Sequence, residues 1–257
     1  MQDSHLVPRS IYKTLSAPGQ PNPNPVLVRS GSAFQTSKQA KTHLLCSTCE
    51  QLLNKRGEKA VIPFIAKDTF SSPIYELVTK LPLLRSENGV PAYSATENTG
   101  FSVDELAHFA MGIFWKASVH SWHNRDGEPL IKLGPYEKPL REYVRAQEEK
   151  PFPSNFSLMV IILPPPKIPL LIGVPIQGPS EDWHRNFRFY IPGVQFVLSV
   201  GKTVDREFCF VSNPLHPIWV HDIEHLVNAI PARMYARGGH LDGPHTTTWG
   251  ALVKRGR

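Results

Sequence analysis

The run Leu158-Met159-Val160-Ile161-Ile162-Leu163 decides the fold class, because it is apolar throughout, rich in β-branched residues and closed by three prolines. A short apolar run of this kind predicts a buried strand. Residues 187–191 and 195–200 alternate along their length, which is typical of strands with one buried face. Residues 207–211 form a further candidate strand. We therefore predict an antiparallel sheet over residues 156–212.

The segments that flank this sheet region predict helices. Ser102, followed by Glu105, forms a capping box at the start of a helix predicted over residues 102–120. The apolar residues of this segment recur at helical spacing: Val103, Leu106, Phe109, Ala110, Ile113, Phe114 and Ala117. Further helices are predicted over residues 135–147 and 217–234. Helices and an antiparallel sheet in separate stretches of the chain predict an α+β fold.

Composition indicates a globular protein. Charged residues make up 19% of the 257 residues and hydrophobic residues 41%, a balance unlike that of disordered chains. The most apolar run, residues 158–163, is too short to cross a bilayer, so we predict no membrane partner. Three cysteines, an odd number, and the polar first residues predict a reducing, cytoplasmic location. The sequence contains no Gly-rich phosphate loop and no serine nucleophile elbow.

Charge divides the chain into a basic first part and a balanced remainder. Residues 1–67 hold nine Lys and Arg but three Asp and Glu, an excess of six that equals the net charge of the whole chain. A basic part of this kind is suited to a polyanion such as nucleic acid, although a solvated basic surface would have the same composition. Residues 16–36 within it have the Pro-rich composition of a loop. We predict three units: a finger over 1–67, an α+β domain of unknown role over 68–237 and a disordered tail over 238–257.

Two short stretches of the basic part contain residues that could carry chemistry. The first is Ser4-His5-Leu6-Val7-Pro8, where residues 5–7 could form a strand; the second is Leu44-Leu45-Cys46-Ser47-Thr48-Cys49-Glu50. A Cys-x-x-Cys turn brings two thiolates within reach of one zinc ion, but zinc requires four ligands. The chain has no second Cys-x-x-Cys, and His43 is the nearest imidazole. The pair could therefore be half of a zinc site or two small buried residues.

Together the two stretches resemble the two halves of the HNH, or ββα-metal, nuclease motif, over about residues 3–59. The resemblance implies a small finger in which a strand-borne histidine faces a helix that begins at the Cys-x-x-Cys turn. It also implies a metal-dependent endonuclease, with Mg²⁺ or Mn²⁺ as the divalent ion and with an incomplete ligand set for Zn²⁺. The first Cys-x-x-Cys of the family would fall before Met1.

The resemblance assigns roles to individual residues. His5 would be the general base that activates a water molecule against a phosphodiester. The metal site would draw on Cys46, Cys49, Glu50, Asn54 and Asp3. Glu50 and Asn54 lie four residues apart and so share a helix face, whereas Asp3 lies two residues from His5. Lys55, Arg56 and Lys59 would hold backbone phosphates.

The sequence departs from this family at positions that matter for cleavage. Ser4 precedes His5 where a better metal ligand is expected, and Glu50 follows Cys49 where the family usually has histidine or asparagine. Two readings other than a nuclease follow. The finger could be a non-catalytic scaffold that binds nucleic acid or a partner protein, or Cys46 and Cys49 could have a purely structural role. His221 and His225, spaced i, i+4, are weaker metal candidates without a third ligand.

Overall fold

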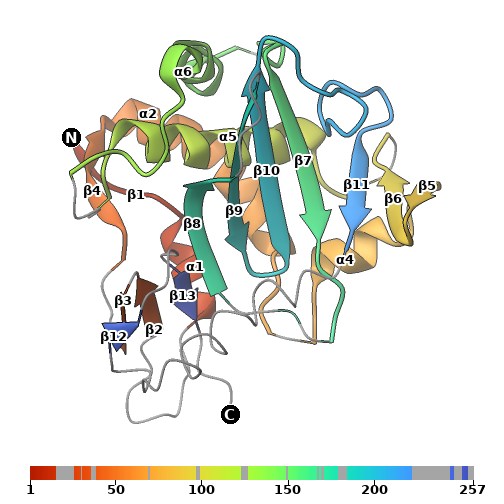
Figure 1. The fold of residues 1–257 in the computed structure, drawn as a ribbon, viewed down its shortest axis with the longest axis horizontal. Helices are drawn as coiled ribbons and strands as arrows, with labels where there is room; N and C mark the ends of the chain where they lie inside the picture. Colours follow the sequence, from red (N-terminus) through yellow and green to blue (C-terminus); the bar gives the residue numbers. More distant parts are fainter. Residues whose placement is uncertain are drawn as a thin grey trace.

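The structure, a computed structural model, describes residues 1–15, 26–29, 31–35, 39–68, 70–96, 99–122, 127–148, 150–166, 168, 171–178, 184–221, 244–245 and 251–253. It confirms the α+β class, because helices gather beside a large mixed sheet and a small two-stranded sheet stands apart from it (Figure 1). None of the described helices is both long enough and apolar enough to span a membrane.

The centre of the large sheet is an antiparallel group of four strands. These strands are β7 (Phe156–Ile162), β8 (Leu171–Gln177), β9 (His184–Ile191) and β10 (Val194–Gly201). Their order in the sheet is β8-β9-β10-β7. The β9–β10 hairpin turns through Pro192 and Gly193, and Gly193 takes a φ of 83°, which a residue with a side chain rarely adopts. The sheet predicted from the apolar runs is therefore present, with β9 and β10 at its centre.

Further strands extend this group on both sides. Beyond β7 lie β11 (Pro217–Val220), which is parallel to β7, and then β6 (Val90–Ser94) and β5 (Leu83–Glu87). Beyond β8 lie β13 (Ala251–Val253), β2 (Val26–Arg29), β3 (Gly31–Gln35) and β12 (Pro244–His245). Segments from both ends of the chain thus join one sheet.

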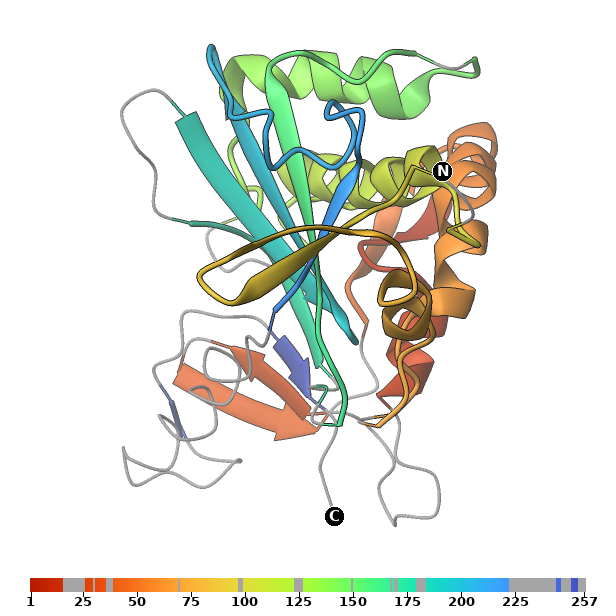
Figure 2. The ribbon, with the colours of Figure 1, turned by 90° about the vertical axis from the view of Figure 1, so that its right-hand side faces the viewer.

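Helix α5 (Val103–Val119) packs on one face of the central strands (Figure 2). The Ser102 hydroxyl accepts a hydrogen bond from the Glu105 N–H at 3.3 Å, so the predicted N-cap is confirmed. The contact is aromatic: Phe114 meets Phe189 edge to face with ring centroids 4.9 Å apart, and Phe109 lies 6.0 Å from Phe196. Outside residues 47–64, the other described helices are α1 (Arg9–Thr14), α4 (Pro73–Val78), η3 (Gly134–Tyr136) and α6 (Glu137–Arg145).

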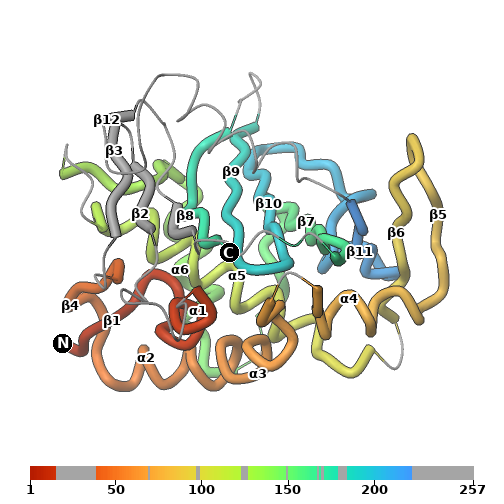
Figure 3. Tube along the Cα trace, turned by 90° about the horizontal axis from the view of Figure 1, so that it is seen from below, coloured from red at the N-terminus to blue at the C-terminus, as the bar shows by residue number. Residues whose placement is uncertain are grey.

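The N-terminal unit, which we call the finger, consists of β1 (Gln2–His5), β4 (Lys41–Leu45) and the helical residues 47–64. Its helical part runs through α2 (Ser47–Leu53), the π-helical turn η1 (Asn54–Glu58), α3 (Lys59–Val61) and η2 (Ile62–Phe64). The finger lies on the same side of the sheet as α5 (Figure 3). At Gly57 a β-carbon would lie 2.8 Å from the Phe109 Cα, so the π-turn and α5 are in close backbone contact.

Three sequence expectations differ from the structure. Residues 207–211 form turns rather than a strand, and the Phe210 N–H bonds to the Leu158 carbonyl at 2.7 Å. The segment expected to begin a helix at Pro217 forms β11 instead, because it pairs with β7; residues 222–234 lie outside the described residues. Residues 26–29 and 31–35, within the expected loop, form strands. Most of the predicted tail, residues 238–257, also lies outside the described residues, and the three-unit division stays a prediction.

Candidate functional site

The β1–β4 ribbon separates the side chains of the finger onto two faces. The strands pair antiparallel, with Ser4 opposite Thr42 and His5 opposite Lys41. Because neighbouring side chains on a strand point to opposite faces, Ser4 and His5 cannot face the same partner. Ser4 is fully buried, whereas His5 is half-buried. Ser4 is thus the residue of this pair that faces the helix.

Ser4 connects the ribbon to the helix that follows the cysteines. Its hydroxyl donates to the Glu50 carboxylate at 2.9 Å, and its oxygen accepts the Leu45 N–H at 3.2 Å. Glu50 lies in the first turn of α2, where a negative charge is favoured by the helix dipole. The carboxylate that was predicted to be a metal ligand therefore already serves as the acceptor for a buried hydroxyl.

Asp3 lies on the opposite face of the ribbon from Ser4. Its carboxylate forms an ion pair with Lys41 at 2.8 Å and lies 3.7 Å from the Nδ1 of His43. The hydrogen bond from Lys41 lowers the pKa of Asp3 below its ordinary value. Asp3 is about half exposed, so this cluster is a surface feature.

His5 is held through its backbone as well as through its ring. The buried ammonium of Lys116 on α5 donates to the His5 carbonyl at 2.7 Å and lies 3.5 Å from the Glu58 carboxylate. Partial burial of the ring lowers the pKa of His5, an effect that a hydrogen bond with the Gln39 side chain opposes. Burial of the ring thus favours the uncharged form of the imidazole.

Cys46 and Cys49 lie where the ribbon turns into α2. Cys46 is exposed and is the N-cap residue, and its sulfur accepts the Cys49 N–H at 3.4 Å. Cys49 is partly buried and is close to Arg145 on α6. The hydrogen bond from the Cys49 N–H lowers the pKa of the Cys46 thiol, whereas burial raises the pKa of Cys49.

The predicted metal ligands do not converge on one point. Asp3 and Glu50 are directed to opposite faces of β1, and Asn54 lies one helical turn beyond Glu50. Across the described parts of the chain, no group of three or more His, Cys, Asp or Glu side chains is placed so that it could hold a metal ion. The donor set of the finger therefore does not fit a single Mg²⁺, Mn²⁺ or Zn²⁺ ion in this arrangement.

The three predicted phosphate-binding residues have different environments. Lys55 and Lys59 are exposed, and among the described residues neither has an ion-pair partner. Arg56 is partly buried and donates to the backbone carbonyl of Ala146 at 2.7 Å and of Glu148 at 3.4 Å. Arg56 thus satisfies carbonyl groups at the C-terminal end of α6, as helix ends require.

Sequence reasoning missed two buried polar residues on α5. Lys116 is 2% exposed, and its partners lie more than fifty residues away in the chain. His108 is 1% exposed; its Nε2 lies 3.1 Å from the Val144 carbonyl, and its Nδ1 has no hydrogen-bond partner among the described residues. Burial, assisted by the charge of Arg56, lowers the pKa of His108 to about 4. The sequence did hold a signal for both residues, because a basic side chain among the apolar residues of a helix needs a hydrogen-bond partner from a distant part of the chain.

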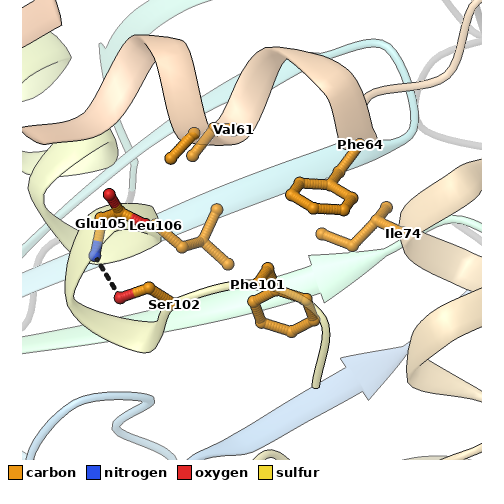
Figure 4. A pocket seen from close by; sticks show the side chains of 8 residues that line it. Val61, Phe64, Ile74, Phe101, Ser102, Glu105 and Leu106 are labelled. Carbon is orange, nitrogen blue, oxygen red and sulfur yellow. Dashed lines mark hydrogen bonds between the residues drawn. The ribbon is translucent and has the colours of Figure 1, made fainter. Parts of the chain in front are cut away.

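A small apolar pocket lies at the other end of the finger helix (Figure 4). Val61 and Phe64 approach it from the helical segment, Ile74 from α4, Leu106 from the first turn of α5, and Phe101 from the chain just before α5. The cavity itself has a volume of about 10 Å³. This is smaller than the roughly 300–1,000 Å³ of ordinary ligand pockets, so the ribbon and α2 remain the candidate site.

Comparisons of this chain with protein-family models, with curated proteins and with solved structures gave no match.

Proposed function

We propose that the protein is a non-catalytic nucleic-acid-binding module that uses the finger as a rigid scaffold. The observation that supports this proposal best is the Ser4–Glu50 hydrogen bond. It engages one oxygen of the carboxylate that the endonuclease reading needs for a metal ion, and it joins the ribbon to the helix directly. A scaffold of this kind presents cations on a fixed surface, which is all that contact with a phosphate backbone requires.

The charges of the finger support a polyanion as the partner. Its described acidic groups are all engaged: Asp3 by Lys41, Glu50 by Ser4 and Glu58 by Lys116. The exposed basic side chains of residues 1–67 outnumber these three acidic groups. They are Arg9, Lys13, Lys41, Lys55, Lys59 and Lys67. Such an excess attracts phosphates and releases their counterions on binding.

A metal-dependent endonuclease is the second candidate, and one observation favours it. Burial lowers the pKa of His5 and so favours the uncharged imidazole, the form in which it can act as a general base. The proposal of cleavage then requires a rearrangement that brings further oxygen ligands, beside Asp3, to the His5 face of β1. A nuclease assay with Mg²⁺ and with Mn²⁺, comparing the wild type with His5→Ala, tests this candidate directly.

The binding proposal is tested by the salt dependence of affinity for short DNA and RNA duplexes of unrelated sequence, measured by fluorescence anisotropy. Replacing Lys55 and Lys59 together by glutamine should reduce the slope of log K against log salt by about two units, roughly 0.9 for each phosphate contact. The loss should be similar for each sequence, because backbone contacts carry no base information.

Two control variants make the result specific to the finger. The Lys80→Gln/Lys202→Gln variant removes two exposed lysines of the larger domain and should leave the slope unchanged. Arg56→Gln should also leave the slope unchanged, because its guanidinium binds backbone carbonyls of the protein. Absence of binding at low salt, or equal slopes for the Lys55/Lys59 variant and the wild type, would contradict the proposal.

A further inference from the structure

The two cysteines at the start of α2 are arranged as an exposed thiol with a second thiol behind it. Cys46 is exposed and Cys49 is half-buried, and their thiols lie within hydrogen-bonding reach of each other. Both are free in the structure. The third cysteine, Cys209, is fully buried, and its sulfur accepts the Ser212 N–H at 3.4 Å. One sulfur of the protein is therefore open to solvent, and it has a neighbour of the same kind.

The backbone geometry allows these thiols to join. Residues three apart on a helix have β-carbons about 5–6 Å apart, whereas a disulfide needs about 3.5–4.5 Å. Cys46 is the N-cap residue and has extended backbone angles, with φ −75° and ψ 165°, and its carbonyl accepts the Glu50 N–H at 3.0 Å. A rotation about its Cα–C bond can bring its sulfur to Cys49 while this carbonyl keeps its hydrogen bond to α2.

The two sulfurs also differ in the way that a two-step oxidation requires. Cys46 is exposed and the Cys49 N–H is directed at its sulfur at 3.4 Å, so a hydroperoxide in solvent reaches this sulfur first. Cys49 is partly buried and is close to Arg145 on α6. The accessible sulfur is thus the nucleophile, and the shielded one is positioned to attack it in turn.

We propose that Cys46 and Cys49 form a reversible dithiol–disulfide pair that is oxidised by hydroperoxides. The Cys46 thiolate attacks the terminal oxygen of ROOH; the O–O bond breaks, Cys46 becomes a sulfenic acid, and the RO⁻ that leaves takes a proton from water. The Cys49 sulfur then attacks the Cys46 sulfur, the S–O bond breaks and the oxygen leaves as water. Over both steps, two thiols and ROOH become the disulfide, ROH and one water molecule. Two molecules of a monothiol such as glutathione return the pair to the dithiol.

This inference is independent of nucleic-acid binding, because it rests only on the positions of the three cysteines. Its test uses the full chain, reduced and then freed of reductant and metal. One equivalent of hydrogen peroxide is added, and remaining thiols, intact mass and disulfide-linked peptides are followed with time. The wild type should lose two of its three thiols, become about 2 Da lighter and yield a Cys46–Cys49 cross-linked peptide.

Single variants separate the two roles and provide the control. Cys49→Ser should stop at the sulfenic acid of Cys46, which a 1,3-diketone reagent traps. Cys46→Ser should lose thiols about tenfold more slowly, because the shielded sulfur then has to react first. Cys209→Ser should behave like the wild type, and circular dichroism reports whether each variant is folded; alanine replaces serine in any variant that is not.

Three results would overturn the proposal. The first is thiol loss that proceeds equally fast in the wild type and in Cys46→Ser. The second is oxidation that ends in disulfides between molecules or in sulfinic acid rather than in the Cys46–Cys49 bond. The third is a zinc ion retained stoichiometrically by the reduced chain at Cys46 and Cys49 that prevents oxidation, since the pair would then serve metal binding.

Discussion

Replacing Lys116 by methionine should weaken the whole fold, because this buried ammonium connects the finger to α5. Its side chain is 2% exposed and donates to the His5 carbonyl at 2.7 Å, with the Glu58 carboxylate 3.5 Å away. Methionine retains most of the aliphatic stem and removes the charge and all three N–H donors. The variant therefore reports on the polar contacts and little on packing.

The expected loss can be worked out from the two partners. Removing one member of a buried ion pair costs about 3–5 kcal/mol, because the other charge is left without compensation. Glu58 is 16% exposed and can be reached by some water, which favours the lower end of that range. The orphaned His5 carbonyl adds to the loss, but the two effects share one nitrogen and are not additive. We expect a loss of about 3 kcal/mol in the free energy of unfolding.

Urea unfolding followed by circular dichroism measures this loss. With an m-value of about 3 kcal/mol per M, the midpoint should fall by about 1 M. The Glu58→Gln/Lys116→Met variant should recover about half of the loss, because no unpaired charge remains. Lys132→Met removes an exposed lysine paired with Glu128 at 3.0 Å and should change stability by less than about 1 kcal/mol. A loss below about 1 kcal/mol for Lys116→Met, or a double variant no more stable than the single one, would refute the reasoning.

Two further predictions concern the contact between the finger and α5. The pKa of His108 is about 4 in the folded chain and near 6.5 in the unfolded chain. Between pH 4 and pH 6.5 the unfolded state therefore binds more protons than the folded state. Stability is therefore full above pH 6.5 and declines towards pH 4, by about 2 kcal/mol between pH 7 and pH 5; urea midpoints should show this decline in the wild type and a smaller one in His108→Asn. Gly57→Ala should lower the unfolding temperature by the equivalent of about 1–3 kcal/mol, because its β-carbon would lie 2.8 Å from the Phe109 backbone. Gly112→Ala, whose β-carbon would meet only the Leu53 side chain at 3.3 Å, should be milder, and equal losses in the two alanine variants would contradict this account.

Local features of this protein were predictable from sequence because they depend on neighbouring residues. The Ser102 cap and the apolar stripe of α5 are contained within one helix, and the structure has both. The runs that form β7, β9 and β10 carry enough apolar and β-branched side chains to specify strands. The antiparallel pairing of β9 with β10 follows from their short connection, the two-residue turn at Gly193.

Features that depend on distant partners were not predictable in the same way. Residues 207–211 have the composition of a strand but form turns, and residues 217–220 form a strand because β7 offers a free edge. Arg56 is one of three cations in a short basic run, yet only it reaches the end of α6. Its sequence neighbours give no indication of this contact, since the acceptor, Ala146, is 90 residues away.

The candidate site shows the same division between what the chain itself specifies and what folding adds. Sequence alone predicted a strand at His5, over residues 5–7, whereas the observed strand β1 also includes Ser4. Within that strand the two-residue period of the pleat directs Ser4 and His5 to opposite sides. Sequence alone also determined that Cys46 and Cys49 lie one turn apart at a helix start. Only the tertiary structure decided which side of β1 the helix covers. Ser4, and not His5, contacts Glu50, because packing α2 and α5 against the ribbon buries one face and leaves the other in water.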